Sequence, residues 1–95
     1  MTENALEGVR VVEFTDEIGS YCGKLLADLG AEVIKVEPPG GGRQRHSAPF
    51  VSGHDGDPDA SLAFWVHNTS KKSAVIDLET AGGQASARKL ALTAD

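Results

Sequence analysis

The sequence is poor in the residues that hold small domains together by means other than packing. It has one cysteine, Cys22, so it cannot form an internal disulfide, and no Cys/His cluster is spaced for a structural metal. Aromatic residues make up 5% of the chain. At 95 residues the chain supports at most one domain, which buries about 60–65% of its unfolded surface. We therefore expect a thin core.

Long apolar runs and an excess of positive charge are also missing. No stretch approaches the ~20 apolar residues of a membrane-spanning helix, and the acidic N-terminus lacks the apolar segment of a signal peptide. Nine basic residues against 14 acidic ones give a net charge of −5, which disfavours non-specific nucleic-acid binding. We expect a cytoplasmic protein with no nucleic-acid partner and no membrane partner.

The first third of the chain has the pattern of a strand, a helix and a strand. Residues 9–14 are apolar and β-branched, which is typical of a buried parallel strand. Residues 20–29 predict a helix that begins at the N-cap Ser20 and ends before Gly30. Its predicted apolar face holds Cys22, Leu25, Leu26 and Leu29. Residues 31–36 predict the second strand, and together these elements make one βαβ unit.

The remainder alternates less regularly. Residues 38–60 carry all four prolines and five glycines, which predicts a long loop that is functional or mobile. Residues 61–67 are a short apolar patch compatible with helix or strand, and we expect Trp65 in the core. Residues 73–78 predict a third strand and residues 82–93 a second helix. This order indicates an α/β fold with a Rossmann-like parallel opening, and two helices cannot cover both faces of such a sheet. We expect residues 1–95 to be an incomplete domain.

The turn at residues 15–20 is the first candidate binding site. Ligands of open α/β sheets bind beyond the carboxyl ends of the strands, often at a helix N-terminus. The dinucleotide fingerprint is absent, although Gly19, Gly23 and Glu37 occupy suggestive places. The preferred interpretation is structural: Gly19 makes the turn, Gly23 permits close packing, and Glu37 is solvated. Because Asp16 and Glu17 would repel a pyrophosphate, a nicotinamide cofactor is a weak hypothesis.

Other polar segments offer less. The run Gly40-Gly41-Gly42-Arg43-Gln44-Arg45-His46 could bind an anion, with a flexible loop of solvated cations as the alternative. Lys71 and Lys72 would add positive charge, but such a pair is usually exposed. The acids of segment 54–59 resemble a calcium loop, yet Ala60 and Val66 stand where Gly and Glu are needed. We expect Cys22 to be a small buried hydrophobe, because nothing indicates a base beside it. From these residues alone no catalytic constellation follows.

Three segments in order resemble a known family. Residues 6–15 (LEGVRVVEFT), 25–40 (LLADLGAEVIKVEPPG) and 68–78 (NTSKKSAVIDL) are similar to the amino-terminal signature of class III CoA transferases. That family includes the formyl-CoA, carnitine and bile-acid CoA transferases and the α-methylacyl-CoA racemases. The resemblance implies the opening of a CoA-binding domain of Rossmann-like fold, in a longer protein that forms an interlocked homodimer.

The resemblance also implies a mechanism. In the transferases an aspartate attacks the acyl-CoA thioester, giving a mixed anhydride and then an aspartyl-CoA thioester, with a carboxylic acid as the second substrate. No aspartate of this chain matches that residue, so we expect no catalytic residue here, and no turnover from the isolated chain. The resemblance implies no metal. Two alternatives stay open: a truncated, non-enzymatic nucleotide-binding or interaction module, and a fragment of an α-methylacyl-CoA racemase.

CoA contacts can be carried over by position, and most are expected to involve the backbone. They fall at Ile18, Gly19, Ile76, Asp77, Leu78 and Glu79. Pro38 and Glu79 stand where some members of the family have basic residues, which removes positive charge from the phosphate site. We therefore expect Arg43 or Arg45 to compensate by binding a phosphate.

Overall fold

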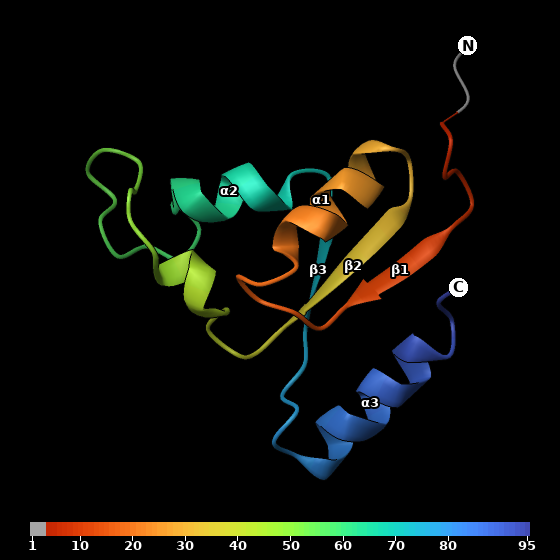
Figure 1. The fold of residues 1–95 in the computed structure, drawn as a ribbon. Coiled ribbons are helices and arrows are strands. Elements are labelled where there is room, and N and C mark those ends of the chain that lie inside the picture. The colour runs from red at the N-terminus through yellow and green to blue at the C-terminus, as the bar shows by residue number, and fades with distance from the viewer. Residues whose placement is uncertain (1–3) are drawn as a thin grey trace.

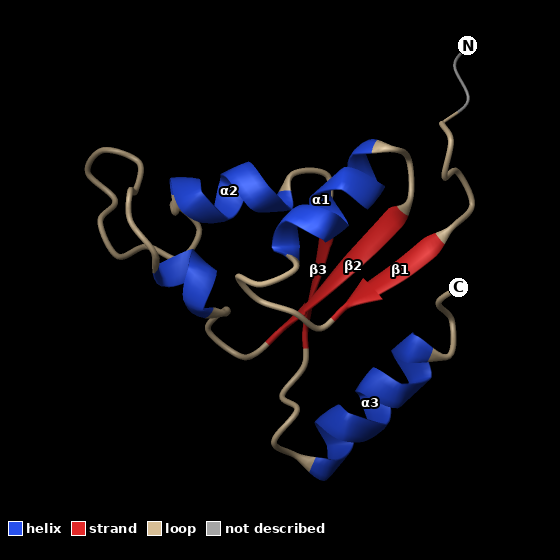
Figure 2. Ribbon diagram, in the orientation of Figure 1, coloured by secondary structure: helices blue, strands red, loops and turns tan. Residues whose placement is uncertain are grey.

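The centre of the molecule is a three-stranded parallel sheet. The computed structural model describes residues 4–95, with strands β1 (Arg10–Glu13), β2 (Glu32–Glu37) and β3 (Lys72–Val75) in the order β1-β2-β3 (Figures 1 and 2). Both pairings are parallel, with Glu13 opposite Lys35 in the first and Lys35 opposite Ser73 in the second. The predicted α/β fold with parallel strands is confirmed.

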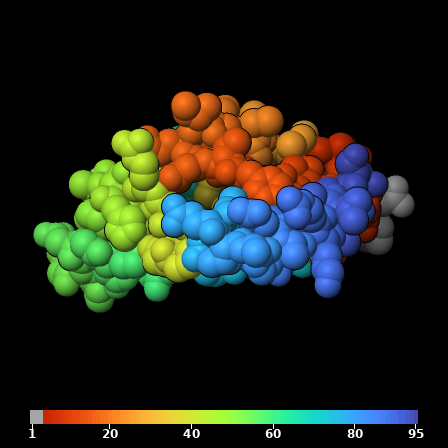
Figure 3. All heavy atoms as spheres, turned by 90° about the horizontal axis from the view of Figure 1, so that it is seen from below, coloured from red at the N-terminus to blue at the C-terminus, as the bar shows by residue number. Residues whose placement is uncertain are grey.

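Helices lie on both faces of this sheet. Helices α1 (Ser20–Asp28) and α2 (Leu62–Asn68) contact each other on one face, and α3 (Ala81–Ala91) lies on the other side (Figures 1 and 3). The apolar patch at residues 61–67, for which the sequence was compatible with helix or strand, thus forms the helix α2. The long loop is interrupted once, by the short 3-10 helix η1 (Arg43–His46). None of the helices within residues 4–95 combines the length and the apolar character that crossing a membrane requires.

The direction of winding reverses at β1. The chain advances from β1 through α1 to β2 and through α2 to β3, and α3 then carries it back to the outer edge of β1 (Figure 1). There the Asp95 amide donates to the Arg10 carbonyl (2.9 Å), and the Arg10 amide donates to the Asp95 carboxylate (2.9 Å). The outer edge of β1 is consequently the point where the two directions of winding meet.

The sheet face beneath α1 changes character along the strands. Successive side chains of a strand point to opposite faces, so Val33, Lys35 and Glu37 share one face of β2. At its amino end Val33 packs with Ala27 and Ala31 in a small apolar core, which is thin as expected. At its carboxyl end the same face carries buried charged groups. The apolar part of the core therefore stops halfway along the sheet.

Helix α1 packs on a different face from the one its apolar residues predict. Its buried residues are Ser20, Gly23 and Ala27. Cys22, Leu25 and Leu29 are exposed, so the predicted burial of Cys22 was wrong. Small residues face inward because the helix lies very close to the sheet: a Cβ on Gly23 would stand 1.9 Å from Glu13 Oε1. Close approach to charged groups, and not the apolar stripe, orients the helix.

Two further local expectations need correction, while a third is confirmed. Gly19, with φ of 91°, occupies the N-cap position assigned to Ser20, whose hydroxyl donates to the Glu17 carbonyl (3.1 Å). Trp65 is partly exposed and not in the core, because its indole N–H donates to the Asp59 carbonyl at the surface (3.1 Å). Gly30 ends α1 with φ of 106°, as predicted.

Candidate functional site

Two adjoining pockets open at the carboxyl end of the sheet. The first has a volume of about 320 Å³ and is lined by Thr15, Asp16, Glu17, Ile18 and Arg43. The second, of about 220 Å³, shares Thr15, Asp16 and Arg43 with it and reaches Lys35 of β2. Seen from this end, the surface is hollowed between the turn after β1, the loop after β2 and the segment after β3 (Figure 3). Ile18 and Arg43, expected at one site from the sequence, thus meet at one pocket.

Asp16 ties the two walls of the first pocket together. Its carboxylate accepts the backbone N–H groups of Arg43 (2.6 Å) and Gln44 (3.4 Å), which begin the 3-10 helix η1. The close contact needs Gly42, where a Cβ would lie 2.8 Å from Asp16 Oδ1. The Asp16 charge is therefore engaged by the N-terminus of η1.

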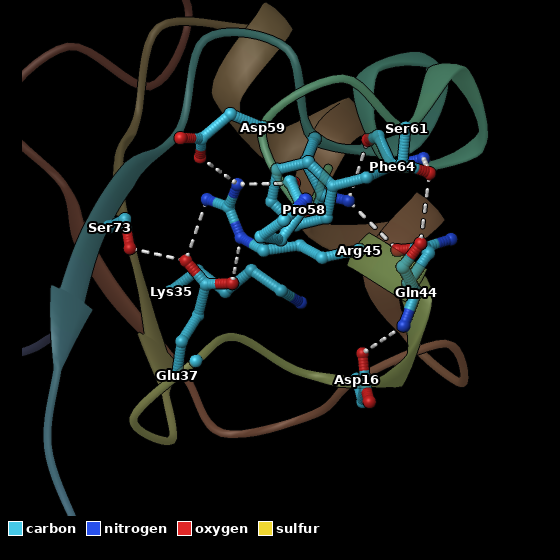
Figure 4. Close-up of polar contacts among 12 residues, drawn as sticks. Asp16, Lys35, Glu37, Gln44, Arg45, Pro58, Asp59, Ser61, Phe64 and Ser73 are labelled. Atoms are coloured by element: carbon cyan, nitrogen blue, oxygen red, sulfur yellow. Dashed lines mark hydrogen bonds and ion pairs between the residues drawn. The ribbon is translucent and has the colours of Figure 1, made fainter. Parts of the chain in front are cut away.

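The two arginines of the loop differ in what surrounds them. The Arg43 side chain is 87% exposed, and its Nε lies 3.7 Å from Glu17 Oε1. Arg45 instead makes a two-bonded ion pair with Glu37 (2.5 and 2.9 Å) and stacks 3.9 Å from the centre of the Phe64 ring. Figure 4 shows the Arg45 guanidinium between this carboxylate, Asp59 and the Pro58 carbonyl. Arg45 fastens the loop to the sheet, whereas Arg43 faces solvent at the pocket.

Glu37 is buried, so the solvated interpretation of this residue was wrong. Burial alone would raise the pKa of its carboxyl, but hydrogen bonds from Arg45 and Ser73 outweigh burial and hold that pKa below its ordinary value. The pKa of Arg45 is raised by the same bond. With Arg45 and Ser73 bound to its oxygens, Glu37 is not presented to the hydroxyls of a ribose. The structure gives the nicotinamide hypothesis no support.

A second charged cluster lies buried beneath the turn. Glu13 of β1 binds Lys35 of β2 (2.8 Å) and Lys71 (2.9 Å), which directly precedes β3. The side chains of Glu13, Lys35 and Lys71 are 5%, 3% and 2% exposed. Desolvation lowers the pKa of Lys71, although Glu13 opposes this. Lys71 is thus not an exposed cation, while its neighbour Lys72 is exposed as expected.

This cluster was missed from the sequence. Asn68, three residues before Lys71, accepts from its ammonium (2.8 Å) and donates to Gln44 in the loop (2.8 Å). The spacing N-x-x-K in the segment similar to the family, together with lysine inside a strand that is otherwise apolar, was the available signal. Neither feature reveals the partner Glu13, which lies 58 residues from Lys71.

Residues 76–79 lie at the same edge of the sheet, after β3. The Ile76 amide continues the ladder by donating to the Glu37 carbonyl (2.9 Å). The Asp77 carboxylate accepts the Glu79 amide (3.0 Å), and its carbonyl accepts the Thr80 hydroxyl (3.0 Å), which itself caps α3. The Asp77 carboxylate therefore serves the local turn. Neither of the two pockets is lined by residues 76–79.

The remaining polar candidates do not form a site. Across residues 4–95 no group of three or more His, Cys, Asp and Glu side chains is arranged to hold a metal. In the acidic segment, His54 lies 3.8 Å from Asp57, which also accepts the Asp59 amide (2.9 Å). These contacts close a polar surface loop.

Comparison with known proteins gives a consistent result. The model of the family described as CoA-transferase family III matches residues 6–95. A succinate–glutarate CoA-transferase of Agrobacterium fabrum is 42% identical over 93 residues, which cover 95% of this chain and 23% of that protein. The crystal structure of a CAIB/BAIF family protein from Brucella suis aligns with a TM-score of 0.87 and 35% identity, over 99% of this chain and 25% of that one.

A crystal structure from Mycobacterium tuberculosis is also similar, with a TM-score of 0.84 and 38% identity over the whole of this chain and 25% of that one. The chain therefore spans about a quarter of the length of the relatives it matches. The region matched by the family model, residues 6–95, includes the three segments that carry the resemblance seen in the sequence.

Proposed function

The chain belongs to CoA-transferase family III, and from that premise we propose that it forms the N-terminal part of the CoA-binding domain of an enzyme that transfers CoA from an acyl-CoA to a carboxylic acid. Several of the similar proteins are named as CoA-transferases, for example the succinate–glutarate CoA-transferase. The acyl donor and acceptor of the present protein are chosen by parts of the site beyond the residues described.

The observation that carries this proposal is the position of the pocket at the reversal of winding. In open α/β sheets, ligands bind outside the carboxyl ends of the strands where the winding direction changes. Here that place is the end of β1, and the 320 Å³ pocket is built from the turn that follows it. Helix α1 also begins there with no side-chain cap, so its N-terminal dipole favours a phosphate.

Within this proposal the site residues have separate tasks. Ile18 and Gly19 offer backbone groups in the turn at the pocket, and the segment of Ile76, Asp77, Leu78 and Glu79 supplies further CoA contacts from the same edge of the sheet. Arg43 binds a phosphate, because its guanidinium is exposed at the pocket with only a long contact to Glu17. Arg45 contributes indirectly, by holding the loop through Glu37. The reacting aspartate lies outside this chain, and the intact enzyme is a cytoplasmic homodimer.

The test is the affinity of the intact protein for CoA, measured by titration calorimetry. A hydrogen bond to a charged group contributes about 1.5–3 kcal/mol, so Arg43→Ala is expected to raise Kd roughly 10- to 100-fold. Arg88→Ala is the matched control, because Arg88 is also exposed but lies in α3 on the other side of the sheet. An unchanged Kd in Arg43→Ala would contradict the phosphate role, and a wild-type protein that binds no CoA would contradict the function.

A further inference from the structure

We propose that the buried cluster of Glu13, Lys35 and Lys71 is a positioning element that fixes the phosphate-binding turn and makes its surroundings positive. The inference rests on the proposed function and assigns a task to three side chains that do not themselves touch the coenzyme. Three observations support it: the contacts of the two lysines, the net positive charge of the cluster, and the packing of α1 against it.

The two ammonium groups hold opposite ends of the turn. Lys35 Nζ donates to the carbonyl of Thr15, where the turn begins (2.9 Å). Lys71 Nζ donates to the carbonyl of Ser20, where α1 begins (2.8 Å). Glu13 binds both lysines, so the two ends are joined through one carboxylate. Residues 15–20 are therefore held at both ends from inside the protein, while Thr15, Asp16, Glu17 and Ile18 between those ends line the pocket.

The cluster also carries an unbalanced charge. Two lysines share one glutamate, which leaves one positive charge in excess when all three groups are ionised. In the neighbouring pair, the charge of buried Glu37 is balanced by that of the partly exposed Arg45. Asp16 and Glu17 place negative charge on the turn of a protein whose net charge is −5. A buried positive charge is screened little by solvent, so it offsets these acids where a phosphate would approach.

The packing of α1 fits the same role. A Cβ at Gly23 would stand 1.9 Å from Glu13 Oε1 and 3.0 Å from Lys71 Nζ, so the helix reaches its position only with glycine there. The N-terminus of α1 and the ammonium of Lys71 consequently lie against the same turn. Lys35 also lines the 220 Å³ pocket, so the cluster forms part of the wall of the candidate site.

Replacing Lys71 by methionine in the intact protein tests the role. The Lys71→Met variant keeps an unbranched side chain that is one atom shorter and removes the charge and the bond to the turn. Because pantetheine lacks the phosphates of CoA, we expect the Kd for CoA to rise at least roughly tenfold and the Kd for pantetheine to change much less. Lys72→Met is the matched control: Lys72 is the next residue, but it is exposed and binds Glu32 on the opposite face of the sheet. It should leave both Kd values unchanged.

A second variant avoids the risk that Lys71→Met does not fold. Glu17 is half-exposed, and Glu17→Gln removes a negative charge from the turn without disturbing the interior. It should lower the Kd for CoA and leave that for pantetheine unchanged. The role is overturned if Lys71→Met binds CoA as tightly as the wild type, if it weakens CoA and pantetheine in parallel, or if Glu17→Gln has no effect on CoA. A wild-type protein that binds no CoA overturns the proposed function instead.

Discussion

The two faces of the sheet each carry an acid between two basic residues, and the two clusters behave differently. On the face beneath α1, Glu13 lies between Lys35 and Lys71, with all three side chains at most 5% exposed. On the opposite face, Glu32 lies between Arg10 (2.5 Å) and Lys72 (2.5 Å), with exposed fractions of 31%, 37% and 68%. Hydrogen bonds to Lys72 and Arg10 lower the pKa of Glu32. The composition is nearly the same, so burial is what separates them.

The difference decides what each cluster contributes. Exposed ion pairs are screened and contribute about 0–1 kcal/mol, whereas removing one member of a buried pair leaves an uncompensated charge. The buried cluster also donates to the backbone of the candidate site, while the exposed one joins strands and the segment around Thr93. Only the buried cluster is therefore placed to affect ligand binding.

The largest expected effect comes from neutralising the two acids. Glu13→Gln leaves two buried lysines without their carboxylate, so we expect it to lower the free energy of unfolding by about 3–5 kcal/mol. Glu32→Gln should lower it far less, because its two ion pairs are exposed to solvent. Urea denaturation of the intact protein measures both. Equal losses in the two variants would show that burial is not what distinguishes the clusters.

The next effect concerns acid sensitivity at Glu37. Because its pKa is lowered in the folded protein, its contribution is complete above the ordinary value of 4.5 and is lost as the pH falls through the lower folded-state value. Glu37→Gln should lower the free energy of unfolding by about 1.5–3 kcal/mol at neutral pH and flatten the loss of stability in acid. Thermal denaturation between neutral pH and strong acid tests this. If the variant loses stability with falling pH as steeply as the wild type does, the prediction is refuted.

Alanine at two helical glycines should act in opposite directions. Gly23→Ala forces a methyl group against Glu13 and should destabilise the protein by roughly 1–3 kcal/mol. Gly82 in α3 has no atom within 4 Å of the Cβ position, so Gly82→Ala should stabilise by up to about 1 kcal/mol. Denaturation midpoints compare the two. A neutral Gly23→Ala would mean that α1 does not pack as closely on the buried cluster as described.

The smallest effect is expected at Lys72. Lys72→Met removes one exposed partner of Glu32, and the change in the free energy of unfolding should stay below about 1 kcal/mol. Salt screens such a pair, since the Debye length falls to ~3 Å at 1 M. The difference from the wild type should therefore vanish at high ionic strength. A difference that persists in salt would place Lys72 among the buried charges.

The order of elements could be predicted because it depends on local patterns. The apolar β-branched runs, the breakers at Gly30 and in the 38–60 loop, and the helical spacing after Ser20 each act over a few residues. The packing of α1 could not be predicted in this way. Its apolar stripe predicted one buried face, but the sheet below carries Glu13 and not an apolar side chain, so Gly23 lies inward.

The candidate site was predictable to a similar degree. Its location followed from the general rule on strand ends, and the resemblance pointed to Ile18 and Gly19. The different surroundings of Arg43 and Arg45, two residues apart, could not be foreseen, because Glu37 and Phe64 come from other segments. The partners of Lys71 were equally hidden, since they lie on β1 and at the start of α1.

The amino-acid sequence alone thus indicated the succession of strands and helices, apart from α2, and the family to which the chain belongs, because both depend on short segments. Which charges are buried, which arginine faces the pocket and how the turn is held were decided only by the folded chain. Those properties depend on side chains that are distant in sequence and come into contact where β1, β2 and the segment before β3 lie side by side. They also depend on the exclusion of water from these contacts.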